Sequence, residues 1–337
     1  MNKSVSSALL LCLFNTFLLG AQTPIVIDSL ESVSKAAKTE MRYDLGNGKT
    51  LVYQTPKKFA FITNLPKDAA GIVTTTFSKK SIKPLLAIAA STGILILADQ
   101  PIVDGVEAFS RQIHLSPDEK NKNVIVKLGG KDVALLRFPG NWNTAFYQVG
   151  QGFPSLLIGA GLFTYGKIKD DYRALSTASQ LAEAFILMGI GTQIVKRITG
   201  RETPGESSTP AGKWRFFPSF SDYQNHTPSY DAFPSGHLAT LMSSITIFSE
   251  NYPEKKWIKP VGYSLTGLVA YSMINNKVHW ASDYPLAIGM GYLCARQVVK
   301  RNRQVVSSTG LQKRRGELQY TFNYVGGSLM PGIIYKF

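Results

Sequence analysis

The tetrapeptide Pro234-Ser235-Gly236-His237 places a titratable histidine and a turn-forming Ser-Gly pair at the start of an apolar stretch. Ser235 is suited to cap a helix, and apolar residues follow it at helical spacing. A helix start also offers unpaired N–H donors and the positive end of the helix dipole, which suit an anion such as phosphate. The tetrapeptide alone leaves both interpretations open, a simple cap or an anion site.

His279 and Asp283 form a second chemical group, in the segment "NNKVHWASDYP". A carboxylate beside an imidazole can hold the ring in one tautomer, and a ring held in this way can act as a base or a nucleophile. Pro285 is tolerated only in the first turn of a helix, so we expect the next helix to begin near Ser282 and to leave His279 just outside it. An ordinary hydrogen bond at a helix start would explain the same pair.

Lys196 and Arg201 form a third group, at the polar end of an apolar stretch that runs into "VKRITGRETP". Cations near the C-terminus of a helix complement its dipole, which is a sufficient structural reason for both residues. Beside the other two groups, however, the same cations could neutralise a bound phosphate.

Six apolar stretches rich in Ala, Gly, Leu and Ile must position these groups, and we predict a helix over each. Before them, residues 23–83 are mixed and polar, with the strand-like pieces "TLVYQ" and "FAFIT". The tail "GELQYTFNYVGGSLMPGIIYKF" alternates apolar and polar residues around two glycines, which predicts a hairpin. The six stretches are Pro84–Ala98, Phe153–Tyr165, Ser176–Val195, Gly236–Phe248, Trp257–Ile274 and Pro285–Val299.

The N-terminus and the charge balance indicate export and an anionic partner. A lysine precedes the apolar run Ala8–Leu19, and small residues follow it, which is the pattern of a secretory signal peptide; an uncleaved membrane anchor is the alternative. Cleavage would remove Cys12 and leave Cys294 in an apolar stretch, where a core position is the simplest reading. The net charge of +15 suits a phosphorylated substrate or an anionic lipid surface, and no nucleic-acid motif supports nucleic acid as the partner.

The six stretches leave the number of membrane spans open. A span needs about 20 mostly apolar residues, and several stretches are shorter, while the third contains Gln180, Glu183 and Gln193. With an exported N-terminus, six true spans would also place the loop after the third helix in the cytoplasm. We therefore expect an exported helical bundle in contact with the membrane, in the periplasm or the envelope membrane.

The three groups together resemble the type 2 phosphatidic acid phosphatase (PAP2) superfamily, which also contains vanadium haloperoxidases. The family pattern is Lys-x6-Arg-Pro, then Pro-Ser-Gly-His, then Ser-Arg-x5-His-x3-Asp. The tetrapeptide matches in full, and so do the lysine, serine, histidine and aspartate of the other motifs. Two arginines do not, because Thr203 and Met273 stand in their places.

The resemblance implies an all-α fold, a six-helix bundle of the PAP2 and haloperoxidase type, with a short β-like N-terminal segment and a C-terminal hairpin. Together with the signal peptide predicted at 1–21, it divides the chain into an N-terminal extension at 22–83, a PAP2-like helical domain at 84–303 and a tail at 304–337.

The resemblance also implies a phosphatase that hydrolyses phosphomonoesters of lipids or small envelope metabolites and needs no metal and no cofactor. His279 would be the nucleophile, Asp283 would orient it, and His237 would protonate the leaving oxygen. The phosphate would be held by Lys196, Ser235 and Gly236, with Arg201 as a partial substitute for the missing arginines. Two alternatives use the same residues: a weakly catalytic or non-catalytic binder of phosphorylated lipids, and a vanadium haloperoxidase.

Overall fold

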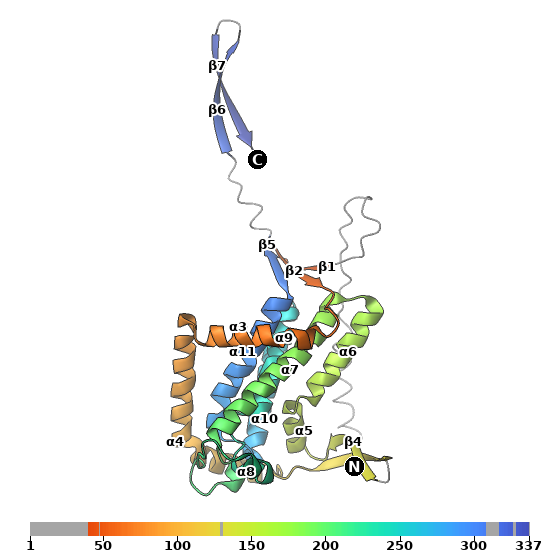
Figure 1. Cartoon of the computed structure of the whole chain (residues 1–337), viewed down its shortest axis with the longest axis vertical. Coiled ribbons are helices and arrows are strands. Elements are labelled where there is room, and N and C mark those ends of the chain that lie inside the picture. Colours follow the sequence, from red (N-terminus) through yellow and green to blue (C-terminus); the bar gives the residue numbers. More distant parts are fainter. Residues whose placement is uncertain (1–39, 47, 129–130, 308–316, 326–327, 337) are drawn as a thin grey trace. The chain divides into compact units, whose positions relative to one another are not determined.

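The computed structural model describes residues 40–46, 48–128, 131–307, 317–325 and 328–336 (Figure 1). The chain divides into two compact units, Tyr53–Gln304 and a smaller one made from Met1–Val52 and Val305–Phe337. The predicted signal peptide at 1–21, with Cys12, lies outside the described residues. The domain boundaries drawn from the sequence stay predictions.

Helices make up most of the described chain, so the fold belongs to the all-α class, as predicted. Short 3-10 helices lie in the connections at Lys79–Ser81, Pro204–Glu206, Thr227–Ser229 and Ala281–Asp283. The α-helices are α2 (Ala60–Thr63), α3 (Leu65–Thr76), α4 (Ile82–Gln112), α5 (Trp142–Gly150), α6 (Phe153–Lys169), α7 (Tyr172–Thr199), α8 (Phe220–Asn225), α9 (Gly236–Asn251), α10 (Ile258–Asn275) and α11 (Tyr284–Asn302).

The strands form three small sheets. Strands β1 (Glu40–Asp44), β2 (Lys49–Gln54) and β5 (Gln304–Ser307) pair in the order β1-β2-β5. Strands β3 (Asn121–Leu128) and β4 (Lys131–Pro139) form an antiparallel hairpin within the helical unit, with a register shift between Val124 and Ile125. Strands β6 (Glu317–Val325) and β7 (Ser328–Lys336) pair antiparallel from Glu317 opposite Lys336 to Val325 opposite Ser328, which confirms the predicted C-terminal hairpin.

Helix α9 lies at the centre of the helical unit and packs against α7, α10 and α11 (Figure 1). The backbones of α9 and α11 approach so closely that a Cβ on Gly291 would lie 2.2 Å from the carbonyl oxygen of Ala239. Only glycine allows this approach, since any side chain would force the helices apart. Because α9 begins with the Pro-Ser-Gly-His sequence, this packing fixes the position of that sequence against α11.

All six apolar stretches are helical, as predicted, except that Trp257 lies one residue before α10, and each helix extends beyond the C-terminal end of its stretch. The largest difference is in α4, which continues through Pro101 to Gln112 instead of ending at Ala98. The added turns are held by packing, because Val103 lies in a buried cluster with Ile274 and Trp280. The second half of α4 therefore covers the segment that contains His279.

The prediction of a strand-like piece at "FAFIT" is wrong, whereas the one at "TLVYQ" is confirmed by β2. Residues Ala60–Thr63 form the short helix α2, and α3 follows directly with a proline in its first turn. Asp68 in α3 is buried and pairs with Arg301 of α11 at 2.5 Å. Tertiary contacts of this kind override the weak strand preference of a short apolar run.

Two helices of the described chain are long and apolar enough to cross a membrane, judged by length and composition alone. They are Lys79–Gln112 and Tyr172–Thr199. The most apolar window of the first has no buried residue, and its side chains of Leu86, Ile94 and Leu97 are exposed.

Candidate active site

Ser235 caps α9 and links the first two of the predicted groups. Its side-chain oxygen accepts a hydrogen bond from the backbone N–H of Leu238 at 3.4 Å, which confirms the predicted cap. The backbone N–H of Ser235 donates to the carbonyl oxygen of Asp283 at 3.2 Å. The start of α9 is thus bonded directly to the turn that follows His279.

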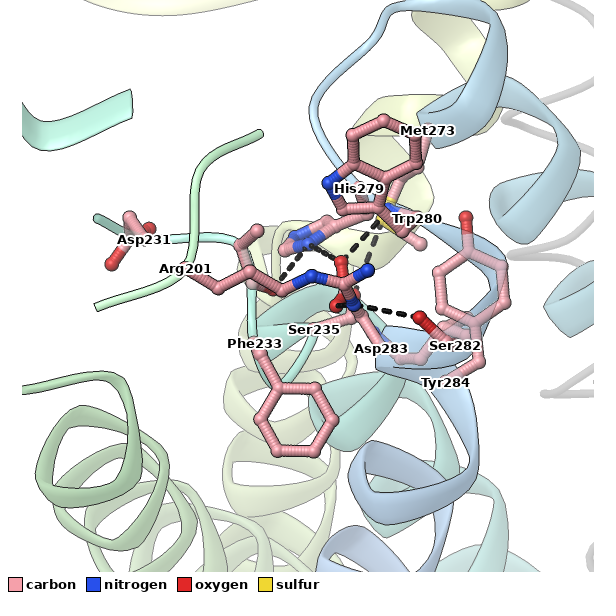
Figure 2. Close-up of polar contacts among 12 residues, drawn as sticks. Arg201, Asp231, Phe233, Ser235, Met273, His279, Trp280, Ser282, Asp283 and Tyr284 are labelled. Atoms are coloured by element: carbon pink, nitrogen blue, oxygen red, sulfur yellow. Dashed lines mark hydrogen bonds and ion pairs between the residues drawn. The ribbon is translucent and has the colours of Figure 1, made fainter. Parts of the chain in front are cut away.

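The ring of His279 is held through Nδ1 by two oxygen atoms (Figure 2). Nδ1 lies 2.7 Å from the carbonyl oxygen of Ala232 and 3.4 Å from Oδ2 of Asp283. A carbonyl oxygen can only accept, so the proton of the neutral ring is assigned to Nδ1, and the lone pair lies on Nε2. This is the tautomer that a nucleophilic histidine requires, and Ala232 orients it more closely than Asp283 does.

His279 lies just outside α11, as predicted from Pro285. The residues between them form a 3-10 turn, Ala281–Asp283, and α11 begins at Tyr284. Oδ2 of Asp283 also accepts the backbone N–H of Trp280 at 2.8 Å. The turn therefore brings the Asp283 carboxylate back to the His279 ring.

His237 faces His279 from the first turn of α9. Their ring centroids lie 6.1 Å apart at an interplanar angle of 70°. The ring of Tyr147 in α5 also packs on the His237 ring, with the centroids 4.6 Å apart. Burial, the neighbouring His279 and the positive charge of Lys196 together lower the pKa of His237 to about 3. His237 is therefore neutral at pH 7 when no anion is bound.

Lys196 lies near the C-terminus of α7 and is nearly inaccessible, at 4% exposure. Its Nζ donates to the carbonyl oxygen and to Oδ2 of Asp231, both at 2.7 Å. The other carboxylate oxygen of Asp231 accepts the hydroxyl of Tyr223. In this structure the charge of Lys196 is thus already matched by a carboxylate.

Arg201 does not fit its predicted role as a phosphate ligand. Its side chain is fully buried, and all five of its N–H groups have acceptors within the protein. The acceptors are the carbonyl oxygen of Ala211, the hydroxyl of Ser282, and the carboxylates of Asp283 at 2.5 Å and Asp99 at 2.7 Å (Figure 2 shows the contacts with Ser282 and Asp283). A phosphate would find no free donor on this guanidinium.

The two positions where the family pattern has arginine are both buried. Met273 is fully buried, and its sulfur accepts from the hydroxyl of Ser235 at 3.4 Å, so this position does adjoin the start of α9. Thr203 is 7% exposed, which leaves no solvated space for a longer side chain there. Two cations of nearby loops also have acidic partners: Arg215 pairs with Glu202, and Lys277 pairs with Glu107 at 2.8 Å.

Asp99 is the residue of this network that sequence reasoning missed. It accepts hydrogen bonds from the backbone N–H of Ser282 at 3.0 Å and from its hydroxyl at 2.5 Å, besides its pair with Arg201. A single carboxylate at the end of an apolar run is unusual, because acidic side chains are rarely buried without a partner. That signal was present in "LILADQP".

Comparison with known proteins places these residues in a family. Residues 177–305 match the sequence model of the PAP2 superfamily, and this segment contains every predicted site residue from Lys196 to Asp283. This segment is a PAP2 superfamily domain. Asp99 and the rest of α4 lie before it in the chain.

The PAP2 domain is similar to one curated relative and to two solved structures. A lipid A 1-phosphatase of Porphyromonas gingivalis is 32% identical over 84 residues, which are 25% of this chain and 18% of that relative's length. The crystal structure of Aquifex aeolicus LpxE has 21% identity and a TM-score of 0.35, covering 47% of this chain and 84% of its own. A transmembrane PAP2-type phosphatidylglycerolphosphate phosphatase from Bacillus subtilis has 16% identity and a TM-score of 0.33, covering 69% and 98%.

Proposed function

We propose that this chain is a phosphatase that removes phosphate from a phosphorylated lipid, through a phosphohistidine on His279 and without a metal ion. The observation that carries the proposal is the pair of oxygen atoms on Nδ1 of His279, which leaves Nε2 with its lone pair directed away from Ala232 and Asp283. Membership of the PAP2 superfamily supports a phosphomonoester as the substrate.

In the first step, Nε2 of His279 attacks the phosphorus atom, and the bond between phosphorus and the ester oxygen breaks. The bonding electrons leave with that oxygen, and His237 donates a proton to it, so the product is a neutral alcohol. Asp283 and the Ala232 carbonyl stabilise the positive charge that develops on the His279 ring. In the second step water attacks the phosphorus, the nitrogen–phosphorus bond breaks, and His237 takes the proton from water.

The start of α9 and Lys196 would hold the phosphate. The first N–H groups of a helix have no intrahelical acceptor, which leaves those of Gly236 and His237 for phosphate oxygens. The hydroxyl of Ser235 lies at the same helix start. Lys196 has a third ammonium proton besides the two that it gives to Asp231.

His237 can act as the acid only after substrate binds. Its pKa of about 3 keeps the ring neutral in the empty site. A phosphate monoester brings negative charge beside the ring, which favours the protonated form. We therefore infer that the ester binds as its monoanion, or that a proton enters with it, and that His237 then holds that proton for the leaving oxygen.

Two features support a lipid as the leaving group, and with it contact with a membrane. The curated relative is named a lipid A 1-phosphatase, although only a small part of it is matched. The helix with the exposed apolar window, Lys79–Gln112, also contains Asp99, which pairs with Arg201. We propose the same exported location as the sequence indicated, with a signal peptide at 1–21 and the site on the periplasmic side.

The test is phosphate release from a lipid phosphomonoester and from a soluble one in the presence of EDTA. We expect release with the lipid, an acid-labile phosphoenzyme after rapid quenching, and loss of both in His279→Ala. His226→Ala is the matched control, since this exposed histidine lies in the loop before α9. Full turnover by His279→Ala, or a strict need for added metal, would exclude this mechanism.

Orientation is tested by thiol labelling in intact cells. Ser221 is exposed on α8, while Cys294 is buried and is the free cysteine of the described residues. A membrane-impermeant reagent should label Ser221→Cys if the site faces the outside. Labelling only after the cells are opened would place the site in the cytoplasm.

The buried state of Arg201 and the pairing of Lys196 favour one other function, a weakly catalytic or non-catalytic binder of phosphorylated lipids. Neither arginine of the family pattern is present, and the remaining cation already has a carboxylate partner. Tight binding of vesicles that contain the lipid phosphate, with no phosphate release, would identify this function.

A further inference from the structure

A groove of about 730 Å³ lies on the helical unit between α2, α6 and α7. Its walls are apolar, and the aromatic and aliphatic side chains of Phe163, Leu156, Leu175 and Leu181 line it. Figure 1 shows α6 beside α7, and the two helices pack together closely below their connecting turn. Small residues on the facing surfaces, Ala160 and Ala178 among them, leave the groove open.

Three lysines, Lys57, Lys58 and Lys167, are among the residues that line this groove. All three are exposed, and none forms an ion pair with another residue of the described ranges. Lys167 lies over the ring of Phe163, with its Nζ 5.8 Å from the ring centroid. Leu156 lies 11 residues before Lys167 on α6, so the apolar wall extends about 16 Å from Lys167 along the helix axis.

The groove is separate from the candidate active site. On α7 its lining ends at Ala182, which lies 14 residues before Lys196, or about 21 Å along the helix axis. Since the hydrocarbon core of a bilayer is about 30 Å thick, the end of the groove at Lys167 would face the membrane surface opposite the active site. Binding in this groove does not depend on catalysis.

We propose that this groove binds one anionic phospholipid, with an acyl chain along the apolar wall and the headgroup phosphate among the three lysines. The combination of an apolar wall and three lysines identifies the ligand class. A small soluble anion would leave the apolar wall uncovered, and a zwitterionic or neutral lipid would leave the lysine charges unmatched. Residues 1–39 fit less well as an occupant, because their three lysines and two acidic residues give no net negative charge to match the three lysines of the groove.

The experiment uses the full chain in vesicles of phosphatidylcholine with added phosphatidylglycerol. A photoreactive phenylalanine analogue replaces Phe163 in the groove or, as the control position, Phe77, which is 83% exposed at the end of α3. Mass spectrometry identifies the adducts. At position 163 we expect phosphatidylglycerol to be enriched over its bulk proportion roughly tenfold, since each lysine near an anionic headgroup contributes several-fold. At position 77 we expect the bulk proportion.

Two pairs of variants separate charge from shape. Lys57→Gln/Lys58→Gln/Lys167→Gln should abolish the enrichment, whereas Lys79→Gln/Lys80→Gln/Lys83→Gln removes the same charge near the start of α4 and should keep it. Ala160→Phe fills the groove and should suppress lipid adducts, whereas Ala90→Phe on the exposed face of α4 should not. The proposal is overturned by adducts in the bulk proportion, by enrichment that survives the triple groove variant, or by cross-linking of position 163 to residues 1–39.

Discussion

Arg201 and Asp283 form an ion pair, 2.5 Å between the guanidinium and Oδ1, in which neither side chain is exposed. On its other side the same guanidinium meets Asp99 at 2.7 Å. The second oxygen of Asp283 faces Nδ1 of His279. Arg201 therefore fixes the carboxylate that helps to orient the proposed nucleophile, and it acts from behind the site instead of on the phosphate.

This arrangement predicts that Arg201→Lys lowers kcat much more than it weakens phosphate binding. A lysine has three donors and cannot reach both carboxylates and the Ala211 carbonyl together, so Asp283 and His279 would shift. Misplacement of a reacting group by about 1 Å can cost roughly a hundredfold in rate. We expect kcat to fall by about that factor, while the inhibition constant for vanadate changes by less than about threefold.

Asp99→Asn tests independently whether the buried network of Asp99, Arg201 and Asp283 positions His279. It keeps the shape of the side chain and removes one of the two charges that hold Arg201. It should lower kcat in the same direction. It should also lower the unfolding temperature moderately, because a buried hydrogen bond to a charged group contributes about 1.5–3 kcal/mol, while Asp283 still compensates the charge of Arg201. A higher vanadate inhibition constant with unchanged kcat, in either variant, would instead make Arg201 a phosphate ligand.

Asp231→Asn should strengthen the binding of phosphate and vanadate. Asp231 neutralises Lys196 through its carboxylate, and the substitution leaves the lysine charge for the ligand. A charge-assisted hydrogen bond contributes on the order of 1.5–3 kcal/mol, so the affinity should rise about tenfold. Asp222→Asn on α8 is the control, because it removes the same charge from an exposed position. Weaker binding would mean that Asp231 positions Lys196 for the phosphate.

Met273→Arg should make the unfolding temperature depend more strongly on bound vanadate. The position is buried next to Ser235, so an arginine there lacks a partner in the empty protein and should lower the unfolding temperature. Vanadate would supply the missing charge and should raise that temperature more than it does in the unsubstituted protein. Met273→Leu keeps the apolar volume and should respond as the unsubstituted protein does. Equal vanadate shifts in all three proteins would show that residue 273 does not adjoin the anion.

The lowered pKa of His237 predicts that the folded protein becomes less stable in acid. Its pKa falls from the ordinary value of 6.5 to about 3 in the folded protein, so between these values the unfolded chain binds a proton that the folded chain does not. The free energy of unfolding therefore has its full value above pH 6.5 and decreases by a few kcal/mol as the pH falls toward 3. His237→Gln should therefore show a smaller drop in unfolding temperature between pH 7 and pH 4.5. His226→Gln, at an exposed position, should behave as the unsubstituted protein.

The sequence by itself determined the helical class, the positions of six helices and the residues at the start of α9. Apolar periodicity reports which segments can form buried helices, and Ser235 carries a local capping signal, so neither depends on distant contacts. The place of His279 just outside α11 was likewise predictable, because Pro285 restricts its own helix locally.

Only the tertiary structure decided what the charged residues do. Arg201 stands two residues from a vacant motif position, which favoured a role at the phosphate, yet its donors are taken by Asp99 and Asp283, respectively 102 and 82 residues away in the chain. The Ala232 carbonyl that holds His279 is a backbone atom, for which no residue type gives a signal. Pairing of buried charges is a long-range property: each charge must find a partner in three dimensions, and the order of residues along the chain does not record which partner it finds.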